Sequence, residues 1–113
     1  MILLMDNLSP IFQALADPTR RAILARLAEG ETHVGALARP FDISAPAISR
    51  HLKVLEDADL ITNERRGKQR FCRLRPETLS AAQDWLDFSR RFWSGSLDRL
   101  ASRFKDSRTE DAS

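Results

Sequence analysis

The chain is poor in the residues that build catalytic and metal centres. Its 113 residues include one cysteine, two histidines, four glycines and no tyrosine. The single cysteine, Cys72, excludes an intramolecular disulfide, so a reducing compartment is the default expectation. Four glycines do not make a glycine-rich phosphate loop. Because three or four soft ligands at metal-binding spacing are missing, we expect no metal site and no cofactor.

Arrangements for catalysis are equally scarce. Ser49 and His51 are two residues apart in a helical segment, so they point in different directions and cannot act as nucleophile and base. Asp84 and Asp87 lie one turn apart, but such a carboxylate pair on an exposed helix face is usually only solvated. The sequence therefore predicts that the protein is not an enzyme.

Long apolar runs are missing too. The opening five residues, MILLM, are apolar but carry no basic segment and no cleavage signature. Nothing approaches the run of about 20 apolar residues that crosses a bilayer. We therefore expect a cytoplasmic protein with neither a signal peptide nor a membrane span.

The composition is that of a small globular protein with a local positive patch. Apolar residues make up 42% and charged residues 30% of the chain, and the net charge is +2. We expect one domain over residues 1–105 and a polar, disordered tail over 106–113. Residues 44–75 hold eight lysines and arginines against four acids. A cationic patch on a nearly neutral chain favours a nucleic-acid partner.

Apolar periodicity and helix start and stop signals indicate four helices in the first half, at about residues 8–16, 18–29, 34–40 and 44–58. Asp17 before Pro18 is a strong start signal, and Gly30 is a natural stop. In the fourth helix, Ile48, Leu52 and Leu55 share one face and are expected in the core.

Two strands and a long helix follow. Residues 60–66 and 69–75 read as a hairpin whose turn is Gly67-Lys68. Cys72 and Leu74 fall on one face of the second strand, which favours a buried Cys72 over a redox sensor. Six cations and no acid lie between Arg65 and Arg75. The fold class is therefore mainly α with a small β-hairpin, in the order α-α-α-α-β-β-α.

The last helix, about 77–104, has two apolar stripes. One stripe comprises Leu79, Ala82, Leu86, Trp93, Leu97, Leu100 and Phe104, and the other comprises Trp85, Phe88 and Phe92. So wide an apolar arc is too much to bury in one small domain. We expect one stripe to pack on its own domain and the other on a second copy, and the pattern leaves open which does which. The four aromatic residues Trp85, Phe88, Phe92 and Trp93 could instead line a ligand pocket.

Helix, turn, helix and basic hairpin together predict a winged helix-turn-helix that reads DNA. The start of such a recognition helix meets base edges, which selects Ala45, Pro46, Ser49 and Arg50. Phosphate contacts are expected from Ser44, His51 and Lys53. The hairpin would serve as a wing that neutralises phosphates through Arg65, Arg66, Lys68 and Arg70. The alternative is a structural helical pair beside a solvated hairpin.

Several segments resemble one known family. ALADPTRRAILARLAEGE, VGALA, ISAPAISRHLKVLEDADLI and RRGKQRFCRL are similar to the ArsR/SmtB winged-helix transcriptional repressors, over about residues 8 to 104. The segment WLDFSRRFWSGSLDRL further resembles a branch whose genes often neighbour lipid-binding-like (SRPBCC) genes. The resemblance implies repression at a palindromic operator, commonly of the protein's own operon. It also implies a homodimer through the first and last helices, with interface residues Ile11, Phe12, Leu15, Trp85, Phe88, Phe92, Trp93, Leu97 and Leu100.

The chain departs from this family where many members bind metal. Their Cys-Val-Cys type motif in the third helix corresponds here to the segment from His33 to Leu37, which has no cysteine, and the last helix has no histidine. The sequence thus predicts a metal-independent, autoregulatory repressor. Two alternatives remain: a sensor whose DNA binding is switched by a small organic ligand or an oxidant, and a protein-interaction module that does not read DNA. The identity of any effector stays open.

Overall fold

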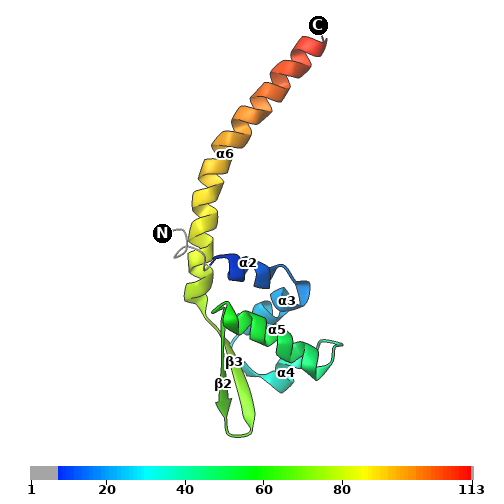
Figure 1. Ribbon diagram of the computed structural model, residues 1–113, viewed down its shortest axis with the longest axis vertical. Helices are drawn as coiled ribbons and strands as arrows, with labels where there is room; N and C mark the ends of the chain where they lie inside the picture. The colour runs from blue at the N-terminus through cyan, green and yellow to red at the C-terminus, as the bar shows by residue number, and fades with distance from the viewer. Residues whose placement is uncertain (1–7, 113) are drawn as a thin grey trace. The chain divides into compact units, whose positions relative to one another are not determined.

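The computed structural model describes the backbone of residues 8–112 and the side chains of residues 8–105. The opening residues 1–5 considered for a signal peptide lie outside this range. The chain divides into two compact units, residues 1–80 and residues 81–113. The elements, labelled in Figure 1, are α2 (Leu8–Leu15), α3 (Pro18–Leu27), β1 (Thr32–His33), α4 (Val34–Ala38), α5 (Ala45–Asp57), β2 (Ile61–Arg66), β3 (Gln69–Leu74) and α6 (Pro76–Ala112). The predicted fold class is confirmed.

Three helices begin at side-chain caps. The Asp17 carboxylate accepts a hydrogen bond from the Arg20 N–H at 3.0 Å, which lowers the pKa of Asp17 and starts α3. The Ser44 hydroxyl accepts from the Ala47 N–H at 3.3 Å and starts α5. At α4 the acceptor is His33 Nδ1, 3.1 Å from the Ala36 N–H. These caps fix the positions at which the helix-turn-helix begins and turns.

Arginines close the end of α2, a role that the sequence analysis did not assign. Arg20 donates to the carbonyl oxygens of Ala14 and Gln13 at 2.8 and 2.9 Å, and Arg21 donates to that of Leu15 at 2.7 Å. The last carbonyls of a helix have no partner within the helix, so these guanidinium groups satisfy them.

The sheet has three strands, one more than predicted. The order is β1-β3-β2, and both pairs are antiparallel. The hairpin has the predicted turn, with Gly67 at φ +63°, a conformation that favours glycine. The additional strand, β1, places Thr32 opposite Cys72 and His33 opposite Phe71. Two residues are too few to show an alternating pattern, so the sequence gives no signal for β1.

The core of the first unit lies between its helices and the sheet (Figure 1). Ile48, Leu52 and Leu55 of α5 are buried as predicted, and Cys72 is fully buried on β3. The other large apolar side chains of this core are Ile11, Ile23, Leu24, Leu27, Leu37, Leu60 and Ile61. One buried face is thereby fixed on α5, and the opposite face is left at the surface.

The last helix, α6, is longer than predicted. It ends at Ala112 rather than near residue 104, and so covers most of the segment 106–113 that the sequence analysis took for a disordered tail. The side chains of that segment, and Ser113, lie outside the described residues, so the domain boundary at residue 105 stays a prediction. No helix in the described part of the chain has both the length and the apolar character needed to span a membrane.

Candidate nucleic-acid interface

The exposed face of α5 carries the residues predicted to meet base edges. Ala45, Pro46, Ser49 and Arg50 are all exposed, and they lie in the first two turns of the helix. Because Ile48 and Leu52 point into the core, the orientation of this face is fixed by packing. The start of α5 therefore presents one arginine, one hydroxyl and two small apolar side chains, a set that can read bases in a major groove.

His51 is engaged within the protein. Its Nδ1 lies 3.4 Å from Arg20 Nη1 and 3.8 Å from the Asp17 carboxylate, and the side chain is half-buried. Since a guanidinium only donates, Nδ1 accepts in this contact and the proton of the neutral ring lies on Nε2. His51 thus ties α5 to the start of α3, a link between residues 31 positions apart that the sequence analysis missed. Its contact to phosphate stays a prediction.

Lys53 also has a partner on its own helix. Its ammonium group lies 2.9 Å from the Asp57 carboxylate, which raises the pKa of Lys53. The pair is highly exposed, and such pairs are weak enough to open. Lys53 thus remains accessible to a phosphate, at the cost of separating from Asp57.

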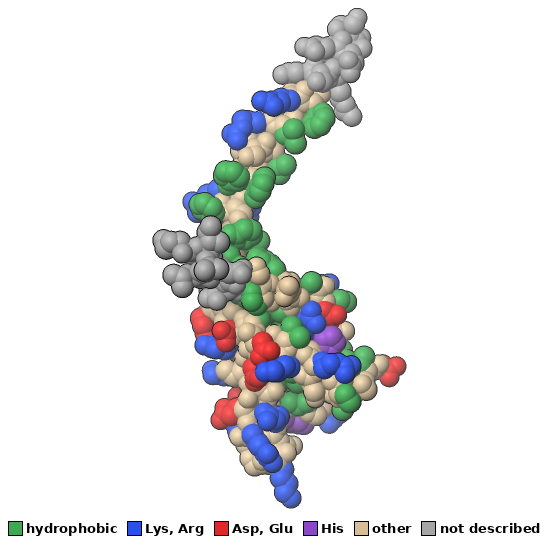
Figure 2. Space-filling view, in the orientation of Figure 1, with side chains coloured by type: hydrophobic (Ala, Val, Ile, Leu, Met, Phe, Trp, Pro, Cys, Tyr) green, Lys and Arg blue, Asp and Glu red, His purple; other side chains and the backbone are tan. Residues whose placement is uncertain are grey.

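The wing cations divide between the two faces of the hairpin. In the register, Arg65 lies opposite Arg70, and Arg66 lies opposite Gln69. Arg65 and Arg70 therefore continue the face that carries buried Cys72, whereas Arg66 shares the other face with Phe71. Figure 2 shows several of these blue side chains gathered at the hairpin end of the molecule. The Arg70 guanidinium donates to the Asn63 amide oxygen at 3.3 Å, and Arg65 donates to the Gly67 carbonyl at 3.2 Å.

Arg66 is the wing cation most strongly bound within the chain. Its guanidinium meets both carboxylate oxygens of Glu31, at 2.7 and 2.9 Å, and Glu64 at 3.3 Å. It also lies 4.9 Å from the centre of the Phe71 ring. Hydrogen bonding to Arg66 lowers the pKa of Glu31, and the two carboxylates raise the pKa of Arg66. Glu31, which directly precedes β1, thus gives Arg66 an acidic partner within the chain, and the contact of Arg66 to phosphate stays a prediction.

The residues considered for metal or redox sensing have structural roles. His33 uses Nδ1 to cap α4. Burial raises the pKa of the Cys72 thiol to about 11, with a smaller contribution from Glu56, and keeps it in its unreactive form. Among the described side chains, no three His, Cys, Asp or Glu residues come together as a metal site.

Residues 81–105 present an apolar surface along α6, visible in green in Figure 2. Phe88, Phe92 and Phe104 are 66%, 60% and 65% exposed. The other exposed large apolar residues of this helix are Trp85, Leu86, Trp93, Leu97 and Leu100. Members of both predicted stripes are thus at the surface. A hollow of about 180 Å³ on α6 is lined by Ser96, Arg99, Leu100 and Arg103, and by none of the four aromatic residues predicted to line a pocket.

The predicted interface residues of α2 differ in exposure. Phe12 and Leu15 are half-buried, whereas Ile11 is only 2% exposed. A side chain with so little accessible surface has almost nothing left to bury against a partner. Ile11 is therefore part of the core of its own unit, and its contribution to a dimer interface stays a prediction.

Comparison with known proteins identifies the family. A family model described as a helix-turn-helix domain matches residues 15–64. The HTH-type transcriptional regulator Rv2034 of Mycobacterium tuberculosis is 48% identical over 90 residues, which cover 80% of this chain and 81% of that protein. The crystal structure of the ArsR family transcriptional regulator RHA00566 has a TM-score of 0.75 and 42% identity, over 79% of this chain and 92% of that chain. The chain belongs to the ArsR family.

Two further similar proteins extend this result. The transcriptional repressor SdpR of Bacillus subtilis is 38% identical over 67% of this chain and 84% of that protein. The homodimeric winged helix-turn-helix DNA-binding domain Mb0332 of Mycobacterium bovis, solved in solution, has 25% identity and a TM-score of 0.65 over 80% of this chain and 86% of that one. The predictions of the family, of a DNA-binding transcriptional repressor and of a non-enzymatic role are thereby confirmed. The individual DNA-contacting residues stay predictions.

Proposed function

We propose that the protein is a homodimeric repressor that binds a palindromic operator, represses its own operon and works without a metal ion. The observation that carries this proposal is the exposed start of α5 beside the cationic hairpin, both in the unit of residues 1–80. Each subunit would place α5 in a major groove, with half-sites about 34–36 Å apart. Polymerase would be excluded from the occupied promoter, and the protein would act in the cytoplasm, where chromosomal DNA lies.

Dimerisation through α6 is part of this proposal. The exposed apolar residues between Trp85 and Phe104 offer more surface than a soluble monomer normally leaves in water. A second copy of the same helix would cover that surface and supply the two-fold symmetry that a palindrome requires. The homodimeric state of Mb0332 supports the formation of a dimer. Each subunit would then form one domain over residues 1–105, and the partner subunit would cover the apolar surface of that domain.

Metal independence gives the most direct test of the proposed mechanism. We expect the full chain to retard a DNA fragment from upstream of its own gene, and the dissociation constant to stay within about twofold when EDTA, zinc, cadmium or arsenite is added. The reason is that the described residues bring together no set of three metal ligands. Fluorescence anisotropy of a labelled duplex measures the constant, and an unrelated duplex of equal length is the control. Release of the DNA by one metal would contradict the metal-independent mechanism.

The cations of the wing should differ in how much they contribute to the salt dependence of DNA binding. Each cation that neutralises a DNA phosphate adds about 0.9 to the slope of log affinity against log salt. We expect Lys68→Gln to flatten this slope by about that amount per subunit. We expect Arg66→Gln to weaken binding with little change of slope, because Arg66 is neutralised by Glu31 and holds the hairpin to β1. A salt titration of operator binding measures both.

Glu31→Gln is the matched variant for the wing. It removes the charge of the partner while leaving the arginine, so binding should weaken if the ion pair positions the hairpin. If Arg66→Gln flattens the salt slope as much as Lys68→Gln does, then Arg66 separates from Glu31 and contacts a phosphate in the complex. That result would contradict the role of Arg66 in positioning the hairpin.

A further inference from the structure

A hollow between the wing and the start of α4 remains unassigned. It has a volume of about 360 Å³ and is lined by His33, Val34, Gly35, Lys68, Gln69 and Arg70. It exists because β1 is short: pairing with β3 stops at His33 and Phe71, and the chain then leaves the sheet to form α4. Gln69 and Arg70 of β3 therefore have no strand beside them on that side, which leaves an open edge facing α4.

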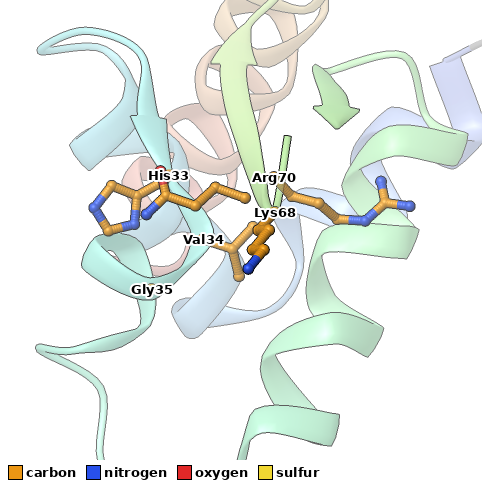
Figure 3. Close-up of a pocket in the computed structure, with 6 residues that line it drawn as sticks. His33, Val34, Gly35, Lys68 and Arg70 are labelled. Carbon is orange, nitrogen blue, oxygen red and sulfur yellow. The ribbon is translucent and has the colours of Figure 1, made fainter. Parts of the chain in front are cut away.

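The lining is rich in hydrogen-bond donors. Lys68 brings an ammonium group, Gln69 an amide, and no carboxylate lines the hollow. Among the residues that the structure describes, Lys68 has no ion-pair partner, unlike Arg66 and Lys53. In Figure 3 the Arg70 side chain extends away from His33, so Arg70 contributes its stem and not its guanidinium group. The chemistry of this hollow fits an anion with several acceptor oxygens.

His33 is held so that it can donate. Its Nδ1 accepts the Ala36 N–H, so the neutral ring carries its proton on Nε2. The ring also packs edge-on to Phe71, with ring centres 6.1 Å apart. A Cβ atom on Gly35 would come within 3.2 Å of His33 Nδ1, so the glycine leaves room for this ring. The tautomer and position of His33 are thus set before any ligand arrives.

The hollow borders the DNA-reading surface. It shares Val34 and Arg70 with a second hollow of about 260 Å³, whose lining includes Ser49 and Lys53 of α5. These two residues belong to the face predicted to meet DNA. A duplex lying on α5 would therefore bring its backbone along the neighbouring hollow.

From this arrangement we infer that His33 and Gln69, together with Lys68, hold a backbone phosphate of the bound operator in the hollow between α4 and the wing. This inference rests on the proposed DNA binding and adds two residues that sequence reasoning did not place at the interface. The phosphate would fix the position of the wing relative to the start of α4, because one group would touch residues of both.

Phosphate ethylation interference tests the inference directly. The probe is a duplex that the full-length protein selects from a random library, so the protein itself defines the sequence used. In the wild-type protein, ethylation of the phosphate held in the hollow should weaken binding of the duplex. In Gln69→Glu and in His33→Asn, ethylation of that phosphate should have no further effect on binding, while ethylation of the other contacted phosphates should weaken binding as in the wild type. Gln69→Glu places a carboxylate in the hollow, and we expect about tenfold weaker binding. Asparagine at position 33 can still cap α4, so that variant should keep its thermal stability.

Controls separate the possible outcomes. Gln13→Glu makes the same chemical change on an exposed position of α2 and should alter neither affinity nor pattern. Failure of the wild-type protein to select any duplex would contradict the proposed function itself. Selection with an interference pattern unchanged in both variants would overturn only the phosphate contact. Inorganic phosphate is titrated into the protein at constant ionic strength while the NMR signals of His33 are followed. These signals should stay unchanged below millimolar concentrations of phosphate. A saturable change of the His33 signals in that range would show that a soluble phosphate occupies the hollow, and would overturn the inference.

Discussion

Replacing Phe92 by aspartate should convert the protein into a monomer and weaken operator binding at least about a hundredfold, since bivalent attachment to two half-sites would be lost. Phe92 is 60% exposed on α6 and lies edge-on to Trp93, with ring centres 5.3 Å apart. In the proposed dimer this aromatic pair is covered by the partner subunit. A carboxylate placed there would be buried without a partner, which costs several kcal/mol according to general estimates.

Ser94→Asp is the matched control for Phe92→Asp. Ser94 is exposed on the same helix, and two helical steps of about 100° place it on a different side from Phe92. This control should stay dimeric and bind the operator as the wild type does. Light scattering after size exclusion gives the mass, and anisotropy gives the affinity. A dimeric Phe92→Asp variant with unchanged DNA binding would move the interface away from this part of α6.

The local features of the fold are the ones that could be predicted. Asp17 and Ser44 start helices because a side-chain oxygen can cap the N–H group three residues later, and this signal needs only neighbouring residues. The burial of Ile48, Leu52 and Leu55 follows from their spacing alone. Gly67 marks the hairpin turn in the same way. Each of these features depends on a short stretch of sequence.

What was missed depends on contacts between distant residues. Glu31 meets Arg66 across 35 positions, and His51 meets Arg20 across 31. No local pattern predicts either pair. The Glu31–Arg66 pair forms only when β1 joins the sheet, and the His51–Arg20 pair forms only when α5 packs on α3. The consequence for the site is specific: the sequence places Arg66 among the cations of the wing, and the fold gives it two acidic partners. His33 likewise gained a place beside the wing only through β1.

The second large effect is expected at Arg50. This residue is exposed in the second turn of α5, next to Ser49 and two positions after buried Ile48. An arginine there can hydrogen-bond the two acceptor atoms of a guanine edge, a contact worth about 1–3 kcal/mol of discrimination against other bases. Arg50→Ala should therefore weaken operator binding by roughly five- to hundredfold and relax the preference at one base pair of each half-site.

Lys53→Ala distinguishes base reading from general attraction. Lys53 is an exposed cation on the same helix, but it is predicted to contact phosphate and is paired with Asp57. Its loss should weaken binding to every sequence to a similar degree and reduce the salt slope by about one per subunit. Binding of both variants to a panel of operators with single base-pair changes measures the difference. If Arg50→Ala loses affinity equally for all operators of the panel, Arg50 contacts the DNA backbone. Ser49 and the apolar side chains of Ala45 and Pro46 would then be the residues that recognise the bases.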